Sequence, residues 1–397
     1  MKFISPLNEE INICKKSSNY NRDSSPKINY FYKIFNKPWG REYLVYQNER
    51  IGIWILHIND NQRTSVHCHF KKDTILIPIK GTFRIDLYNS YEILNELEKL
   101  YIPKNTFHGL GSYKDDSVIM EIEIYTEGIK HTDKNDLLRL RDNYNRDKHT
   151  YENSVKEEDM KDNKIINFHD NDNFVYGDTE INISEIPNEL SDLIMLISGV
   201  IYQNNVINPP SIINTDKISY LSNQCKFLSF QNNYLEENKK IIYNKKHLQD
   251  LLSLNSFTNI GLTSGCFDIM HVGHINFLKK CRKQCDKLFV CLSSDKQINC
   301  LKGNNRPINN INDRIRMITC MKYVDYVILY NEIDSNLEKE LDNIMNIINP
   351  DFWFKGDDYK EEDIIVKHPS LKQIILFENI KYKSTTNIVN KIKGNVS

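Results

Sequence analysis

The sequence contains no alanine, no C-x-x-C pair and no long apolar run. Its 397 residues carry 52 Lys and Arg against 53 Asp and Glu, which gives a formal net charge of -1. Without an excess of positive charge, the chain lacks a bulk field for non-specific binding of nucleic acid. No stretch approaches the roughly 18 apolar residues of a membrane span, and the N-terminus lacks the apolar run of a secretory signal. We therefore expect a cytoplasmic protein with neither nucleic acid nor membrane as a partner.

The nine cysteines are odd in number and scattered along the chain. This usage predicts reduced thiols rather than a disulfide framework or a zinc knuckle. The missing alanine removes the best helix former, and the abundance of asparagine weakens that residue as a turn signal. Secondary structure is therefore predicted mainly from the spacing of apolar residues.

The first part of the chain divides into a leader and a β-rich region. Residues 1–29 are polar and predict a poorly ordered leader. Residues 30–147 contain short apolar runs, several of which alternate apolar and polar residues as half-buried strands do. Short, evenly spaced strands are typical of a sandwich or barrel. The predicted strands are Glu42–Tyr46, Ile51–Ile58, Thr74–Ile79, Thr82–Leu87, Leu100–Ile102 and Ser117–Tyr125.

Residues 148–245 form a less regular middle region. Charge dominates from His131 to Lys164, which predicts an exposed helix or linker. Weak strand patterns from Ile165 to Phe230 predict a second, degenerate β unit, and Tyr234–Leu254 has a helical pattern.

Residues 246–397 alternate apolar strands with helices. The predicted strands are Ile260–Thr263, Lys287–Leu292 and Val324–Leu329, and the helices between them are Ile275–Cys285 and Asn312–Met321. This alternation predicts an α/β domain with a parallel sheet and crossover helices.

Three histidines in the β-rich region have the spacing of a metal site. His67 and His69 are two residues apart on one strand, so their side chains lie on the same face. His108 follows a Pro-x-Asn turn and belongs to a later strand. Three imidazoles can form a facial metal site. The competing interpretation makes them polar interior residues of a barrel.

The segment Gly265–His274 predicts an anion site in the C-terminal region. It follows an apolar strand and opens a helix, so free backbone N–H groups and the helix N-terminus face one crevice. His271 and His274 lie on one face of the first turn and can donate hydrogen bonds to phosphate oxygens. Gly273 allows close approach of a nucleotide to the backbone. Basic residues and helix starts at successive strand ends converge on this crevice, which suits a triphosphate; they are Asp295, Lys302, Arg306, Arg314, Lys355–Tyr359 and Lys383–Val389.

The segment from about Phe257 to Lys393 resembles the cytidylyltransferase-like nucleotidyltransferase superfamily, and most closely the heptose 1-phosphate adenylyltransferases. The resemblance implies a Rossmann-like domain in which a sugar-phosphate oxygen attacks the α-phosphorus of ATP or CTP, with Mg²⁺ on the triphosphate and pyrophosphate leaving. The implied catalytic residues are His271, His274, Lys302 and Arg314. The implied nucleotide-binding residues are Gly265, Cys266, Phe267, Asp268, Gly273, Asp295, Lys355, Gly356, Asp357, Asp358, Ser384, Thr385 and Thr386.

One residue leaves the base of the nucleotide open. Asp357 gives Gly-Asp-Asp where the heptose enzymes have Gly-Gly-Asp, and this run resembles glycerol-phosphate cytidylyltransferases. The chain lacks the Arg-Thr-x-Gly run of those enzymes and keeps the Lys-Gly-x-x-Arg-Pro pattern of the heptose group. A heptose 1-phosphate-like acceptor is therefore favoured, with a glycerol- or polyol-phosphate cytidylyltransferase as the alternative.

The β-rich region resembles the cupin barrel, a double-stranded β-helix, of type II mannose-6-phosphate isomerases over about Phe35 to Asp147. Lys37–Glu42, the histidine pattern and Asp136–Arg146 carry the resemblance. It implies a bound Zn²⁺, Fe²⁺ or Mn²⁺ ion. The expected acidic ligand falls on Thr74, which leaves Asp73 as the nearest carboxylate, so the implied ligands are His67, His69, Asp73 and His108. The barrel either isomerises or binds a sugar phosphate, or is a non-catalytic carbohydrate-binding or dimerising module. We expect a homodimer from the resemblance.

Overall fold

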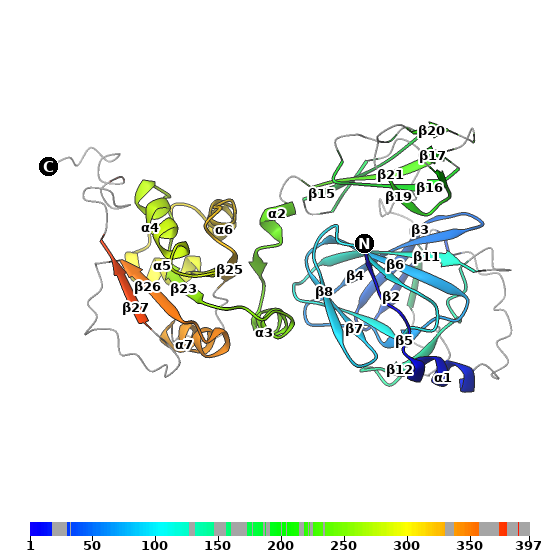
Figure 1. Cartoon of the computed structure of the whole chain (residues 1–397), viewed down its shortest axis with the longest axis horizontal. Coiled ribbons are helices and arrows are strands. Elements are labelled where there is room, and N and C mark those ends of the chain that lie inside the picture. The colour runs from blue at the N-terminus through cyan, green and yellow to red at the C-terminus, as the bar shows by residue number, and fades with distance from the viewer. Residues whose placement is uncertain are drawn as a thin grey trace. The chain divides into compact units, whose positions relative to one another are not determined.

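The computed structural model describes residues 1–17, 30–31, 33–126, 132–146, 156–159, 173–176, 178–185, 187, 191–199, 201–203, 205–213, 218–220, 222, 225–232, 235–329, 337–356, 373–378 and 388. The chain divides into two compact units, Met1–Leu235 and Glu236–Ser397 (Figure 1). Within the described ranges, no helix is both long and apolar enough to cross a membrane.

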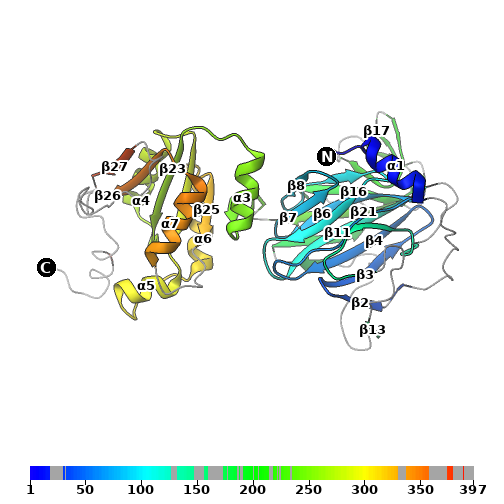
Figure 2. The same cartoon turned by 90° about the horizontal axis from the view of Figure 1, so that it is seen from below.

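The first unit is built around a β-barrel made of two sheets. An eight-stranded sheet has the order β1-β9-β6-β11-β4-β3-β2-β13, and a five-stranded sheet has the order β12-β5-β10-β7-β8. Figure 2 shows the long strands β4, β6 and β11 side by side. The strands are β1 (Lys2–Phe3), β2 (Lys33–Lys37), β3 (Gly40–Gln47), β4 (Ile51–Ile58), β5 (Val66–Cys68), β6 (Lys72–Lys80), β7 (Phe83–Leu87), β8 (Tyr91–Leu94), β9 (Leu100–Ile102), β10 (His108–Ser112), β11 (Ser117–Tyr125), β12 (Leu138–Arg141) and β13 (Lys156–Asp159).

Alternation along the long strands gives this sheet two apolar faces. Leu76 and Ile119 pack inside the barrel with Trp54 and Phe83. Their sequence neighbours on β6 and β11 point the other way, because side chains alternate across a strand. These outward residues would be exposed on a simple barrel, yet they are buried here.

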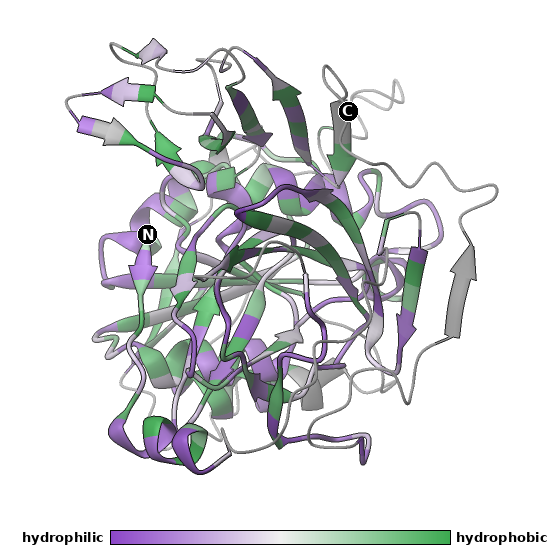
Figure 3. Cartoon of the chain, turned by 90° about the vertical axis from the view of Figure 1, so that its right-hand side faces the viewer, coloured by the Kyte–Doolittle hydropathy of each residue, from purple (hydrophilic) through white to green (hydrophobic). Residues whose placement is uncertain are grey.

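A third layer covers that outer face. It is a five-stranded sheet of order β14-β15-β21-β16-β19. Figure 3 shows strands of the chain that carry both hydrophobic (green) and hydrophilic (purple) residues. Ile181 and Phe230 of this layer share one core with Ile53 and Ile77 of the barrel. The predicted second β unit is thus confirmed as strands, and it packs on the barrel. A small sheet of order β18-β17-β20 completes the unit. The strands are β14 (Asn173–Tyr176), β15 (Thr179–Ser184), β16 (Leu193–Ser198), β17 (Ile201–Gln203), β18 (Asn205–Ile207), β19 (Ser211–Ile213), β20 (Ser219–Tyr220) and β21 (Lys226–Asn232).

Two predictions for the first unit need correction. The leader was expected to be poorly ordered, but β1 pairs with β9 and residues Asn8–Ser17 form helix α1. The α1 residue Glu10 is buried and accepts a hydrogen bond from Phe107 N at 2.7 Å. The charged segment was expected to be a helix or linker, but Leu138–Arg141 pairs as β12 with β5 because Leu138 is buried there. Residues 18–29 lie outside the described ranges.

The second unit is an α/β domain, as predicted. Its sheet has the order β22-β25-β24-β23-β26-β27, and every described pair in it is parallel. Strand β22 pairs with β25, so the unit begins before residue 246 and the helix expected over Tyr234–Leu254 is interrupted. The elements are α2 (Leu235–Asn238), β22 (Ile241–Ile242), α3 (Lys245–Leu254), β23 (Ile260–Gly265), α4 (Val272–Arg282), β24 (Lys287–Leu292), α5 (Asp295–Lys302), α6 (Ile311–Thr319), β25 (Tyr326–Leu329), α7 (Leu337–Ile348), β26 (Phe352–Gly356) and β27 (Gln373–Phe377).

Removing a large side chain from the shared core should destabilise the whole first unit. We expect Phe230→Ala to lower its free energy of unfolding by about 3–5 kcal/mol, because the change deletes a fully buried ring and leaves a cavity. Val175→Ala is the control, since Val175 is 69% exposed on the same layer. Urea unfolding followed by circular dichroism measures both. Equal midpoints for the two variants would contradict the shared core.

Candidate functional sites

The turn after β23 joins two histidines in a reciprocal cap of helix α4. His271 is the N-cap residue, and its Nδ1 accepts a hydrogen bond from Gly273 N at 3.1 Å. His274 Nδ1 in turn accepts from His271 N at 3.4 Å. The two rings stack with their centroids 3.9 Å apart. The arrangement is a capping box in which both cap side chains are imidazoles.

This cap determines which ring nitrogens carry protons. A nitrogen that accepts an N–H hydrogen bond has no proton of its own, so each ring must carry its proton on Nε2. Burial, together with the charges of His271 and Lys302, lowers the pKa of His274 to about 4, so its ring is neutral near pH 7. Two Nε2–H donors therefore lie at the positive N-terminal end of α4, where an anion is favoured.

Asp268 holds the loop that faces this turn. Its carboxylate accepts hydrogen bonds from Arg306 Nε at 2.6 Å and from the backbone N–H groups of Ile308 and Asn309. Burial acts to raise the pKa of Asp268, but these donors lower it below its ordinary value. Phe267, just before it, has a φ of 45°, a left-handed conformation that strains a residue with a side chain. Asp268 is thus occupied by the chain itself.

Arg314 occupies a different place from the one predicted. Its side chain is fully buried, although we expected it to contact phosphate. Its guanidinium donates to the carbonyl oxygens of Cys266 at 2.8 Å and Ser293 at 2.7 Å, and to Asp295 Oδ1 at 2.6 Å. Nε donates to Asn309 O at 3.1 Å. Four of its five N–H groups are used, so Arg314 joins the strand-end loops and is not available to a phosphate in this conformation.

The other predicted residues of this site lie at the same edge of the sheet where they are described. Lys302 ends α5 and is exposed, and its charge acts on His274. Lys355 is the penultimate residue of β26, and its Nζ donates to Ser264 Oγ at 2.8 Å. A Cβ at Gly265 would lie 2.9 Å from the ring of Phe267, so a larger residue there would crowd that ring. The predicted residues outside the described ranges are Asp357, Asp358, Ser384, Thr385 and Thr386.

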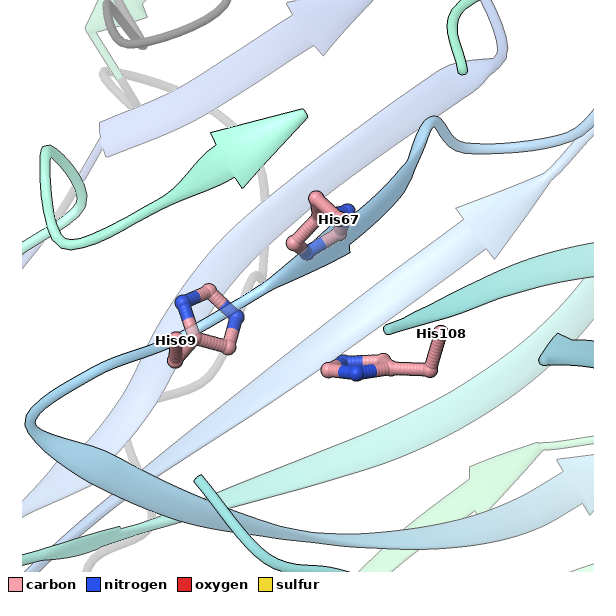
Figure 4. A group of neighbouring side chains, drawn as sticks. All are labelled: His67, His69 and His108. Carbon is pink, nitrogen blue, oxygen red and sulfur yellow. The ribbon is translucent and has the colours of Figure 1, made fainter. Parts of the chain in front are cut away.

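The three predicted histidines of the barrel converge (Figure 4). His67 lies on β5, His69 directly follows it, and His108 begins β10. Their ring centroids are 5.0 to 5.6 Å apart, and one nitrogen of each lies within 4.8 Å of the others. Strands β5 and β10 pair with His67 opposite His108, which places these two rings together.

Backbone carbonyl groups orient all three rings. Nδ1 of His67 bonds to Ser65 O at 2.9 Å, Nδ1 of His69 to Asp136 O at 2.5 Å, and Nδ1 of His108 to Thr106 O at 3.0 Å. A carbonyl can only accept, so each Nδ1 carries the proton and each Nε2 keeps a free lone pair.

These lone pairs fit a divalent metal ion. His69 Nε2 is buried and has no hydrogen-bond partner among the residues that the structure describes. Burial lowers the pKa of all three histidines, that of His108 to about 4, which keeps them neutral as a metal requires. Nitrogen ligands held by carbonyl groups are typical of Zn²⁺, Fe²⁺ and Mn²⁺ sites.

Asp73 is not the fourth ligand that we expected. Its carboxylate accepts from Tyr101 Oη at 2.6 Å and from Lys104 N at 2.7 Å, away from the histidine group. Alternation along β6 explains the error, since Asp73 shares the outward face with Ile75 while Lys72 and Thr74 face inward.

Lys72 is the residue that the sequence analysis missed. It is buried, forms an ion pair with Glu123, and lies near enough to the histidines for its charge to lower their pKa beyond the effect of burial. Leu76 packs inside the barrel, and side chains two residues apart on a strand lie on the same face. Lys72 is four residues before Leu76, so this spacing could have predicted that its side chain points inward.

The buried His247 and the half-buried His274 should make the second unit less stable in acid. Burial lowers the pKa of His247 and of His274 to about 4, whereas both titrate near 6.5 in the unfolded chain. Between these values the unfolded state binds the extra protons, so the free energy of unfolding should fall as the pH falls from about 6.5 to 4. We expect His247→Gln to flatten this dependence in urea titrations. An unchanged slope would contradict the assignment.

Two family models match the chain. The model described as Cytidylyltransferase-like matches residues 262–391, which contain the histidine cap. The model described as Mannose-6-phosphate isomerase C-terminal matches residues 24–142, which contain the three-histidine group.

Known relatives match parts of the chain. This chain is 38% identical over 148 residues to the "Bifunctional protein HldE" of Campylobacter fetus subsp. fetus (strain 82-40). The matched region covers 37% of this chain and 31% of that protein. This chain is 36% identical over 165 residues to the protein of the same name from Campylobacter concisus (strain 13826), covering 42% and 33%. A solved lipopolysaccharide core biosynthesis protein from Thermoplasma volcanium GSS1 is 29% identical, with a TM-score of 0.25, and covers 31% of this chain and 98% of that one. The chain spans about a third of the length of the curated relatives it matches. Residues 24–142 are therefore similar to the family described as Mannose-6-phosphate isomerase C-terminal, and residues 262–391 are similar to the family described as Cytidylyltransferase-like.

Proposed function

We propose that the second unit transfers a nucleoside monophosphate from ATP or CTP to a sugar phosphate and releases pyrophosphate. The observation that carries this proposal is the reciprocal cap of His271 and His274, which leaves two Nε2–H donors at the N-terminus of α4. Donors fixed in this way suit the α- and β-phosphates of a bound nucleotide.

The reaction needs no protein nucleophile. An oxygen of the acceptor phosphate forms a bond to the α-phosphorus, and the bond from that phosphorus to the bridging oxygen of pyrophosphate breaks. The protein contributes position and charge. The two imidazoles donate to phosphate oxygens, and the exposed Lys302 supplies a positive charge beside them. A Mg²⁺ ion carried by the triphosphate would neutralise part of its charge.

Arg314 and Asp268 hold the loops around the histidine cap in place. Arg314 fixes the carbonyl of Cys266 in the turn, and Asp268 fixes the loop that contains Arg306. Neither has its charge turned toward an open phosphate site, so we assign both a positioning role.

A heptose 1-phosphate-like acceptor is the substrate that the sequence favours. Lys302-Gly303 and Arg306-Pro307 follow the pattern of heptose enzymes, while Asp357 follows that of glycerol-phosphate cytidylyltransferases. Pyrophosphate release from ATP or CTP with heptose 1-phosphate or glycerol 3-phosphate separates these alternatives. No release with any of the four pairs would contradict both.

Replacing His271 by asparagine should distinguish its role as the N-cap of α4 from its role as a hydrogen-bond donor to phosphate. Asparagine is a good N-cap residue, so the stability of the second unit should change by less than about 0.5 kcal/mol. The variant lacks the Nε2–H donor, and the rate of pyrophosphate release should fall by about 10²–10³-fold. Stopped assays of pyrophosphate and thermal unfolding measure the two effects. A variant that keeps the full rate would overturn the assigned role.

We propose that the barrel holds a divalent cation on His67, His69 and His108 and binds or isomerises a sugar phosphate. The buried Nε2 of His69, which has no partner in the described part of the chain, supports the metal, and the family match supports the substrate class. A bound ion would act as a Lewis acid toward a carbonyl or hydroxyl oxygen. Lys72 would place a positive charge beside the developing negative charge of such a ligand. The homodimer and the cytoplasmic location stay predictions.

Metal analysis tests this centre directly. After dialysis against Zn²⁺ and removal of free metal, we expect about one ion per chain, because three neutral imidazoles converge. His69→Ala should lose the ion. Asp73→Asn is the matched control and should retain it, since Asp73 bonds to Tyr101 and Lys104 instead. Equal metal content in wild type and His69→Ala would exclude the centre.

A further inference from the structure

Helix α1 contacts the barrel at both segments that carry the three histidines. The Glu10 carboxylate accepts a hydrogen bond at 2.7 Å from the backbone N–H of Phe107, directly before β10. Cys14 lies one helical turn further along α1. Its sulfur is 3.5 Å from the sulfur of Cys68, which stands on β5 between the other two histidines. A pair of thiols 54 residues apart in sequence thus joins the N-terminal helix to a ligand strand.

The two sulfurs form a defined buried contact. Cys14 is 4% exposed, and Cys68 is fully buried where they pack with Phe107 and Leu138. Cys14 Sγ donates to Asn105 O at 3.7 Å, so the Cys68 thiol is the donor between the two sulfurs. A disulfide bond is about 2.0 Å long, so the sulfurs must approach by about 1.5 Å. Rotation of the two side chains with a small shift of α1 supplies this movement.

Helix α1 is attached to the barrel by few groups. Of its ten residues only Glu10 and Cys14 are buried, and the Lys15 and Lys16 that follow are exposed. A segment with so little buried apolar surface opens locally at a much lower free energy than the strands of a core. Opening of α1 brings the Cys14 thiol to solvent, and its return places that sulfur on Cys68.

We propose that Cys14 and Cys68 form a reversible disulfide that fixes α1 to the barrel beside the three histidines. The oxidant is a small disulfide of the glutathione type. The Cys14 sulfur attacks one sulfur of this molecule, whose S–S bond breaks and releases a first small thiol. The Cys68 sulfur then attacks the Cys14 sulfur of the mixed disulfide and releases a second. The two protons leave on the released thiols, and two electrons pass from the protein to the oxidant.

The bond would turn a weak attachment into a covalent one. In a compartment that keeps thiols reduced, a disulfide of this kind is typically transient and sensitive to oxidation rather than a permanent part of the fold. Because Glu10 on the same helix holds Phe107 N, the bond would fix both histidine-bearing segments to one helix. It would also close a long loop, which restricts the unfolded chain and stabilises the first unit.

Oxidation of the full chain followed by peptide mapping tests the pair. The chain is incubated with excess oxidised glutathione, the remaining thiols are alkylated in denaturant, and the protein is digested with trypsin. We expect a peptide of residues 3–15 linked to one of residues 64–71, each of which contains a single cysteine. Dithiothreitol should separate the two. In Cys68→Ser, Cys14 should stop at the mixed disulfide with glutathione, because the attacking sulfur is missing.

Cys281 and Cys285 provide a matched control within the same chain. Both are buried, but the Cys285 thiol donates to the Cys281 carbonyl oxygen at 3.4 Å. We expect both to stay thiols under the same conditions. Calorimetry should show the first unit of the oxidised wild type unfolding about 5–10 °C higher than the reduced form, whereas the same treatment should leave Cys14→Ser unchanged.

Four results would overturn the proposal. Wild type in which Cys14 and Cys68 both remain thiols would show that α1 does not admit the oxidant. Wild type that stops at glutathione on Cys14 would show that the two sulfurs do not meet. An equal yield of a link between Cys281 and Cys285 would make the oxidation indiscriminate. A link from Cys14 to Cys68 without a rise in the unfolding temperature would exclude its role in fixing α1.

Discussion

The active edge of the parallel sheet depends on two buried ionic groups of opposite sign. Arg314 joins the ends of β23 and β24 by donating to Cys266 and Ser293, and it ties both to Asp295. Asp268 joins the same turn to the loop around Arg306. A buried charge is costly unless its hydrogen-bonding capacity is filled, so removing any partner would leave an uncompensated group. This requirement fixes the loops that surround the cap of α4.

The histidines of the two units present different groups at Nε2: a proton in the α4 cap and a lone pair in the barrel. The hydrogen-bond partner of Nδ1 determines which of the two is present. In the α4 cap, Nδ1 of His271 and of His274 accepts a backbone N–H, so Nε2 carries a proton and can donate to an anion. In the barrel, Nδ1 of each histidine donates to a backbone carbonyl, so Nε2 carries a lone pair and can bind a cation. Under the proposed function, histidine would therefore bind phosphate in one site and a metal ion in the other, depending on the backbone group that Nδ1 contacts.

The sequence predicted the strands and the positions of the histidine groups better than the long-range contacts around them. Period-two and strand-helix patterns located the barrel strands, the parallel sheet and all three barrel histidines, because these depend on local spacing. Asp73 was assigned wrongly because the chain turns between His69 and β6, and a linear count does not carry a face across a turn.

Long-range pairing explains the other misses. Arg314 was assigned to phosphate because charge alone does not tell whether a guanidinium will be consumed by carbonyl groups distant in sequence. The docking of α1 through Glu10 was missed for the same reason, since its partner Phe107 is 97 residues away. A polar segment such as the leader is predicted to be exposed because charged residues are mostly found at the surface. Only the structure shows that the Glu10 carboxylate of this segment is buried against Phe107 N.

The interior of the barrel contains ion pairs that stability alone would not select. Lys72 and Glu123 are both buried and paired, and Lys134 lies 3.7 Å from Glu123 and from Glu42. Apolar side chains of similar volume would often give an equal or more stable core, because desolvating such charges offsets most of their attraction. The outer face of the same sheet is apolar and gains its stability from the third layer. The barrel therefore keeps buried charged groups on its inner face, and one of them, Lys72, lies close enough to the three histidines to lower their pKa.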